Sequence, residues 1–126
     1  MRIFLMACSI MLSASGAFAQ ALAPMEKSVT TYTDRFAVQL KAYNPYPSAQ
    51  RFQVRILNED GGPARGVAAT AHTLIVPPND IAGFYVWGES PVSRHIEVCL
   101  TSQFFATGEG AMMRGEVCGK YIITRR

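Results

Sequence analysis

The chain has 126 residues, of which 49% are hydrophobic and 17% are charged, and its formal net charge is +3. This composition excludes an intrinsically disordered chain and a coiled coil, and a chain of this length forms a single domain. The small net charge, with no run of Lys or Arg longer than the final pair, indicates a protein with no nucleic-acid partner.

The segment from Met1 to Ala19 has the features of a secretory signal peptide. Arg2 supplies a positive charge, residues 3–12 are mostly apolar, and Ala17 and Ala19 place small side chains at both specificity positions of a cleavage site. The apolar segment is too short to span a bilayer, so we expect no stable membrane insertion. Cleavage after Ala19 leaves a mature domain, Gln20 to Arg126, in the periplasm or outside the cell.

The first half of this domain shows the period-two alternation of β-strands. Residues 27–33 are expected to form a first strand, and Arg35–Tyr43 is the clearest one. Residues 44–48 contain two prolines and end that strand. Residues 50–57 form the next strand, and residues 58–63 form a turn. The side chains predicted to face the core are Phe36, Val38, Leu40 and Ala42 in one strand and Phe52, Val54 and Ile56 in the other.

The second half continues the same pattern. Residues 67–76 form either two short strands or one kinked strand, and residues 81–87 form a strand whose buried face the sequence leaves open. Residues 94–101 and 116–124 complete the set. About seven short strands in about 100 residues predict an all-β fold, a single immunoglobulin-like antiparallel β-sandwich.

The cysteines predict a disulfide and its register. Cys8 lies in the signal peptide, and although residues 5–8 resemble a lipoprotein box, residues 3–7 are too short an apolar region for one. Cys99 and Cys118 remain in an oxidising compartment and are expected to be joined, on the polar outer faces of their strands. If they are opposite each other in an antiparallel pair, Glu97 is opposite Lys120 outside and Ile96 is opposite Tyr121 inside.

Residues 35–101 resemble the first domain of periplasmic pilus chaperones and the related major-sperm-protein domains. The resemblance rests on the segments FAVQL (36–40), YNP (43–45), FQVRI (52–56), LIVPP (74–78) and FYVW (84–87). It implies an immunoglobulin-like fold and a role in holding another protein. Those chaperones have a second domain and an Arg and a Lys in the cleft between the domains. This sequence provides one domain, so neither residue is carried over.

The sequence offers little chemistry for catalysis. It has two histidines, no Gly-x-Ser-x-Gly segment and no glycine-rich phosphate loop before a helix, so we expect no enzyme and no cofactor. His95 with Met112 and Met113 suggests a lesser alternative, a small periplasmic copper-binding protein, because thioethers and imidazoles suit Cu(I). These three residues are few for a copper carrier, and a surface role for His95 is the simpler interpretation.

The strongest candidate for binding is the segment of residues 103–115, predicted as a long hairpin loop. It carries Phe104, Phe105, Met112 and Met113 beside glycines, and long loops and methionine-rich surfaces often bind partners. Alternatively, the two phenylalanines continue the strand or close the end of the core.

The final strand is a second candidate. Residues 116–124 are expected to form a sheet edge that accepts a partner's strand, unless Lys120 is a charge that discourages such pairing. We therefore predict an exported, non-catalytic protein-binding module, chaperone-like or an assembly accessory, monomeric when free. Its partner would be another envelope or secreted protein. The alternative is a structural component of an envelope assembly.

Overall fold

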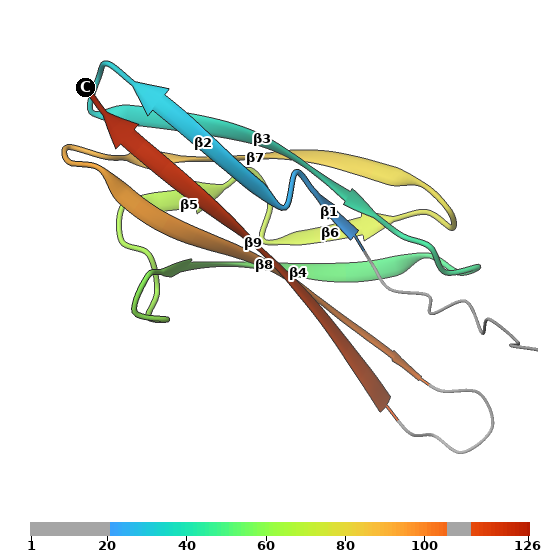
Figure 1. Ribbon diagram of the computed structural model, residues 1–126. Coiled ribbons are helices and arrows are strands. Elements are labelled where there is room, and N and C mark those ends of the chain that lie inside the picture. The colour runs from blue at the N-terminus through green and yellow to red at the C-terminus, as the bar shows by residue number, and fades with distance from the viewer. Residues whose placement is uncertain (1–20, 106–111) are drawn as a thin grey trace, which may run out of the picture.

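The structure, a computed structural model, describes residues 21–105 and 112–126, with side chains for 21–102 and 115–126. The predicted signal peptide and Cys8 lie outside the described residues. The described chain forms nine strands (Figure 1). Their bounds are β1 Ala21–Ala23, β2 Glu26–Thr31, β3 Arg35–Tyr43, β4 Gln50–Asn58, β5 Val67–Ala69, β6 Thr73–Val76, β7 Ile81–Glu89, β8 Arg94–Phe105 and β9 Met112–Arg125.

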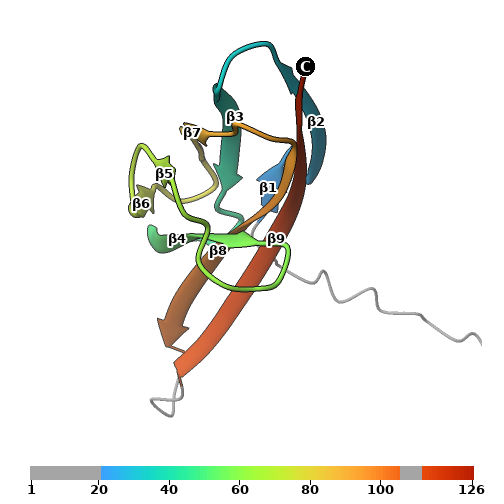
Figure 2. The same cartoon turned by 90° about the vertical axis from the view of Figure 1, so that its left-hand side faces the viewer.

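The strands form two sheets that face each other (Figure 2). One sheet, here called sheet A, has the order β1-β3-β7-β5, and the other, sheet B, has the order β2-β9-β8-β4-β6. All paired strands are antiparallel except β2 and β9, which are parallel. The predicted immunoglobulin-like sandwich is confirmed. Across residues 21–105 and 112–126, no helix has the length and apolar character needed to cross a bilayer.

The strand count differs from the predicted seven at two places. Residues 67–76 form two short strands, β5 and β6, and each joins a different sheet. The short edge strand β1 was not predicted, because its three residues show a single inward side chain, Leu22, and three residues are too few to display a period.

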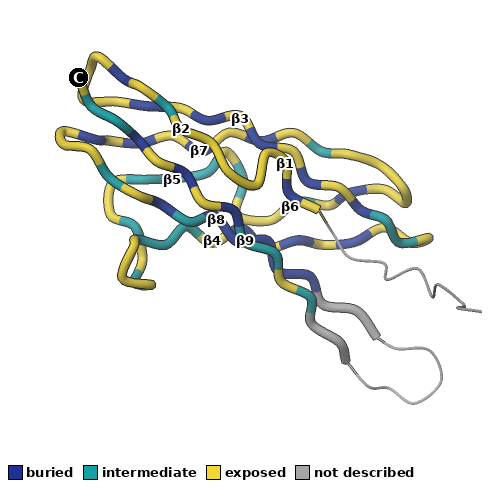
Figure 3. Tube along the Cα trace, viewed as in Figure 1, coloured by how far each residue is buried: buried dark blue, intermediate teal, exposed yellow. Residues whose placement is uncertain are grey.

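The core lies between the sheets and follows the predicted alternation. In β3 every second residue is buried, and β4 buries Phe52 and Val54 in the same way (Figure 3). The open question about residues 81–87 is also settled. Phe84 and Val86 face the core, while the side chains between and after them are exposed on the outer face of sheet A.

The chain crosses from sheet A to sheet B between β1 and β2, and Tyr121 of β9 holds this crossing. The Tyr121 hydroxyl donates a hydrogen bond of 2.5 Å to the carbonyl oxygen of Pro24, and the Lys120 main-chain N–H donates one of 2.8 Å to that of Met25. The crossing backbone lies so close to β9 that a Cβ on Gly119 would be 2.9 Å from the Met25 oxygen. Glycine is therefore needed at this position.

Burial of the Tyr121 hydroxyl has a consequence for stability at high pH. Burial raises the pKa of this phenol from 10.0 to about 12, so the folded state holds the proton more tightly than the unfolded state. The resulting stability is fully present below pH 10 and is lost as the pH rises toward 12. As the pH is raised from 10 to 12, we expect the urea concentration at the unfolding midpoint to decrease, and to decrease less in Tyr121→Phe. Tyr85→Phe, on the outer face of sheet A, is the control and should keep the wild-type fall.

Asn44 fastens the loop after β3 to the end of β6. Its side chain is fully buried, and its amide nitrogen lies 2.9 Å, 3.0 Å and 3.1 Å from the carbonyl oxygens of Ser48, Val76 and Pro77. Its amide oxygen accepts a hydrogen bond of 2.9 Å from the N–H of Tyr46. One side chain thus supplies donors and an acceptor to two loops that come from different sheets.

Candidate partner-binding site

Strands β8 and β9 form a long two-stranded ribbon whose far end projects beyond the other strands (Figures 1 and 2). Strand β4 pairs with β8 only as far as Ser102. Among the residues that the structure describes, β8 pairs with β9 alone from Gln103 to Phe105. The predicted long loop of residues 103–115 is therefore wrong in extent, because both strands continue into it and leave only residues 106–111 outside the described residues.

The four residues predicted to bind a partner lie at this far end. The register pairs Phe104 with Met113 and Phe105 with Met112, so all four belong to strands. The alternative that the phenylalanines continue the strand is confirmed for the backbone. The side chains of these four residues lie outside the described residues, and their part in binding stays a prediction.

One half of β9 has an open edge. Strand β2 pairs with Lys120 to Arg125 only, and in the part of the chain that the structure describes, residues 112–119 have no strand partner on the side away from β8. The prediction of a sheet edge over residues 116–124 is therefore wrong for residues 120–124, which pair with β2, and the open edge covers residues 112–119 instead. Lys120 is exposed and marks the boundary, because it pairs with Glu26 of β2 on one side and with Glu97 of β8 on the other.

The main-chain groups of β9 alternate between the two sides of the strand. Cys99 and Cys118 are opposite each other with Cα atoms 4.1 Å apart, which is the close spacing of a pair that exchanges no hydrogen bonds. The N–H and C=O of Cys118 therefore point away from β8, and so do those of Glu116 two residues earlier. Lys120, two residues later, confirms this direction, because its N–H bonds Met25 on the β2 side.

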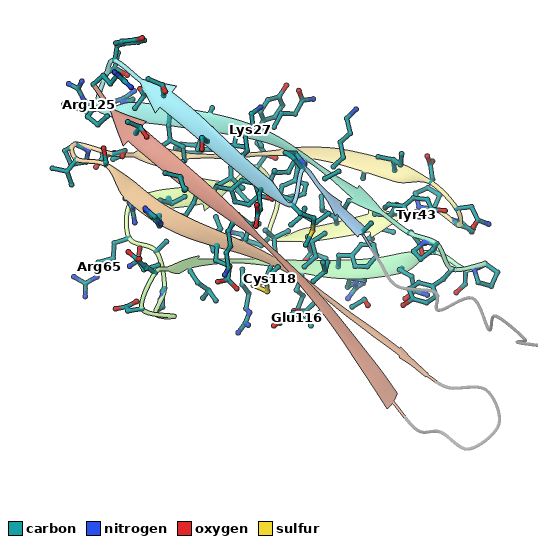
Figure 4. The ribbon with its side chains drawn as sticks, in the orientation of Figure 1. Lys27, Tyr43, Arg65, Glu116, Cys118 and Arg125 are labelled. Atoms are coloured by element: carbon teal, nitrogen blue, oxygen red, sulfur yellow. A yellow bond between two sulfur atoms is a disulfide. The ribbon has the colours of Figure 1, made fainter. Side chains whose placement is uncertain are left out.

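The predicted disulfide and its register are confirmed. Cys99 is bonded to Cys118, Glu97 pairs with Lys120, and Ile96 pairs with Tyr121. The bond lies at the start of the open edge, on the outer face of sheet B (Figure 4). It holds β8 and β9 together at the start of the projecting ribbon.

One detail of the disulfide differs from the prediction. Cys99 is only 1% exposed, although it lies on the outer face. Long polar side chains lie on the same face: Arg55 of β4 is opposite Cys99, and Glu116 bonds Arg55 at 3.2 Å and the Thr101 hydroxyl at 2.8 Å. A polar face can thus bury a sulfur when charged side chains lie over it.

Removing the disulfide should lower stability without changing the fold. The two cysteines are 19 residues apart, and closing a loop of this length contributes about 3 kcal/mol in the chain-entropy model. We expect the double variant C99A/C118A to lose this amount in urea unfolding followed by the fluorescence of Trp87. A loss below about 1 kcal/mol would show that the long β8–β9 ladder alone holds the ribbon.

The structure separates the residues of the copper alternative. His95 pairs with Ile122, whereas Met113 lies nine residues earlier on β9, about 30 Å away along the strand. Among the described residues, the one group of metal-ligand atoms that lie close together consists of Glu97, Cys99 and Cys118. Its two sulfurs are joined in the disulfide and are not available as thiolate ligands.

Comparisons with known proteins agree with this architecture. No family model and no curated protein matches the sequence. A chain of the Salmonella enterica SafA pilin–SafB chaperone complex is 17% identical, with a TM-score of 0.70 over 89% of this chain and 57% of that one. The E. coli chaperone DraB is 13% identical, with a TM-score of 0.70 over 86% and 55%. A C. elegans major-sperm-protein family member, WR4, is 12% identical, with a TM-score of 0.63 over 83% and 97%.

These matches concern the fold. The chain spans a little over half the length of the chaperone structures and nearly all of the major-sperm-protein structure. Identities this low carry no residue-by-residue correspondence. The resemblance seen in residues 35–101 is confirmed at the level of the fold, which is the immunoglobulin-like sandwich of pilus chaperones and major-sperm-protein domains.

Proposed function

We propose that this protein is an exported, non-catalytic binding module that holds another envelope protein, as a chaperone or an assembly accessory. The observation that carries the proposal is the open edge of β9, where residues 112–119 have main-chain groups with no strand partner in the described chain. In this proposal residues 1–19 are the signal peptide, and the disulfide suits an oxidising compartment.

The open edge is suited to binding an extended segment of a partner. An added strand forms main-chain hydrogen bonds with the outward N–H and C=O groups, and its side chains alternate between the two faces. The ladder to β8 and the disulfide already hold this edge in an extended conformation. Little conformational entropy is therefore lost on binding. The solved relatives named as chaperones, one of them in complex with a pilin, support this kind of partner.

A single proline tests the edge. Because the Glu116 N–H points outward, Glu116→Pro removes one edge donor and leaves the bonds between β8 and β9 in place. We expect this variant to capture at least about tenfold less partner from the crosslinked cell envelope, measured by quantitative mass spectrometry, since one lost hydrogen bond and a steric block each weaken strand addition.

Glu116→Ala is the matched control. It loses the same contacts with Arg55 and Thr101 but keeps the main-chain N–H, so it should capture as much partner as the wild type. Circular dichroism and the unfolding midpoint establish that both variants fold. Equal capture by the proline and alanine variants would remove the β9 edge from the binding site. Wild-type protein that captures no specific partner would contradict the proposed function itself.

A further inference from the structure

The outer face of sheet A carries a row of exposed apolar side chains that the proposed function does not use. Ile81, Tyr85 and Trp87 of β7 lie on this face and are 57%, 48% and 51% exposed. Phe84 and Val86 face the core from the same strand. This row belongs to the sheet opposite the β9 edge, so it requires an explanation of its own.

Strand β3 places polar and cationic side chains beside this row. The register pairs Gln39 with Tyr85 and Ala37 with Trp87, so the ring of Trp87 stands next to a small side chain. Ala68 of β5 pairs with Trp87 on its other side. A hollow of about 460 Å³, which includes Arg35 in its lining, adjoins Trp87.

Two cations bracket the aromatic pair. Lys41 is opposite Gly83, one pair before Tyr85 on this face, and Arg35 is opposite Glu89, one pair after Trp87. The two cations are six residues apart on β3, which is about 20 Å along the strand. Neither forms an ion pair within the described residues. The face therefore presents two aromatic rings on β7 and, on the neighbouring strand β3, one cation beyond each end of this pair.

The narrow shape of this face favours a linear ligand. Strands β1 and β5 have three residues each, so along most of its length of about 30 Å sheet A consists of β3 and β7 alone in the described chain, and a ligand one chain wide covers this strip. Main-chain groups lie in the plane of the sheet, so this face offers side chains alone and lacks the main-chain bonds that recognise an extended peptide. A polymer one chain wide that has apolar ring faces, hydroxyl groups and negative charges matches all three kinds of side chain.

We propose that the outer face of sheet A binds an acidic polysaccharide. Sugar rings stack on Tyr85 and Trp87, Gln39 bonds to hydroxyl groups, and Lys41 and Arg35 bind carboxylates along the chain. Glu89 lies beside Arg35 and opposes such a ligand, which makes it a useful probe of charge. The site is independent of the β9 edge, so a module held on a glycan by sheet A keeps that edge free for a protein.

The chain's single tryptophan reports binding directly, because Trp87 is part of the site. The oxidised protein is titrated with hexagalacturonate, which has a carboxylate on every ring, while the Trp87 emission is recorded. We expect a saturable blue shift that weakens with salt. The neutral hexamer maltohexaose should bind about tenfold more weakly, because it cannot use the two cations. Tyr85→Ala should weaken hexagalacturonate binding by about tenfold, the value of one lost stacking contact.

Charge variants separate this site from adventitious stacking. Arg35→Gln and Lys41→Gln should each weaken hexagalacturonate binding by about threefold, and Glu89→Gln should tighten it. Tyr32→Ala is the control, because Tyr32 is 76% exposed in the turn between β2 and β3, outside the row. Unchanged Trp87 emission with hexagalacturonate would overturn the proposal. Arg35→Gln and Lys41→Gln variants that bind hexagalacturonate as tightly as the wild type would also overturn it. A response only to oligothymidylate or to anionic lipid vesicles would assign the face to those ligands instead.

Discussion

Asn44→Ala is expected to lower the free energy of unfolding by about 3–5 kcal/mol, because it removes the four hydrogen bonds of a fully buried amide and leaves the buried Val76 carbonyl oxygen without this partner. The amide side chain is fully buried and contacts three carbonyl oxygens and the N–H of Tyr46. Alanine fills the space poorly and replaces none of these contacts. Urea unfolding followed by circular dichroism measures the loss.

Asn58→Ala provides the comparison for Asn44. The Asn58 side chain also bonds to the main chain, at 3.0 Å to the Pro63 carbonyl oxygen, and its amide oxygen accepts a bond of 2.7 Å from Arg94, but Asn58 is only partly buried and water can replace these contacts. We expect a loss of about 1–2 kcal/mol, smaller than that of Asn44→Ala. Similar losses in the two variants would mean that burial of the Asn44 network adds nothing to its strength.

Gly119→Ala is expected to lower stability by about 3 kcal/mol, because the crossing between the sheets has no space for a methyl group. The added Cβ would be closer than 3 Å to both the Tyr121 ring and the Met25 carbonyl oxygen. Relief requires either β9 or the crossing backbone to move, and movement breaks the bond from Tyr121 to Pro24. Thermal and urea unfolding both report this change.

Gly83→Ala is the matched control for Gly119→Ala. Gly83 also lies inside a strand, but the nearest atom to its added Cβ is the Leu40 oxygen at 3.9 Å. Alanine there should leave stability unchanged or raise it by about 0.5 kcal/mol through the unfolded chain. A loss in Gly83→Ala as large as that in Gly119→Ala would assign the effect to strand glycines in general and not to the crossing.

The sequence allowed accurate prediction wherever one strand face is buried and the other is wet. In β3 and β4 the alternation fixes both the strand and its inward side chains. The cysteine pair allowed a prediction about strand pairing as well, because a covalent link between two alternating strands defines their register. That register, with Glu97 opposite Lys120, agrees with the structure.

The far end of the β8–β9 ribbon could not be predicted by the same reasoning. Beyond Ser102, β8 has no strand partner except β9 in the described chain, so pairing between the two strands continues where the sandwich no longer imposes an alternation. Residues 103–105 accordingly lack a period-two pattern, and the glycines nearby suggested a loop.

The open edge of β9 depends on a distant element. Strand β2 ends the free segment by pairing with Lys120 and the residues after it, and nothing within residues 112–119 signals where that pairing begins. Asn44 was missed for a similar reason. Beside Pro45 it suggested only a turn. Its partners Val76 and Pro77 lie more than 30 residues later, at the end of β6, which belongs to the other sheet.

The parallel pairing of β2 with β9 also constrains the order of folding. Glu26 of β2 pairs with Lys120 of β9 in sheet B. Strand β2, which is synthesised early, therefore cannot pair until β9, which is synthesised late, is present. Until then β2 has no partner, and the Tyr121 contact that holds the crossing from β1 cannot form. Contacts between such distant segments fold slowly and leave strand edges exposed to aggregation in the meantime. A chain that emerges N-terminus first therefore completes its sandwich only after Arg125 has emerged, and release before that point yields a species with an unpaired β2.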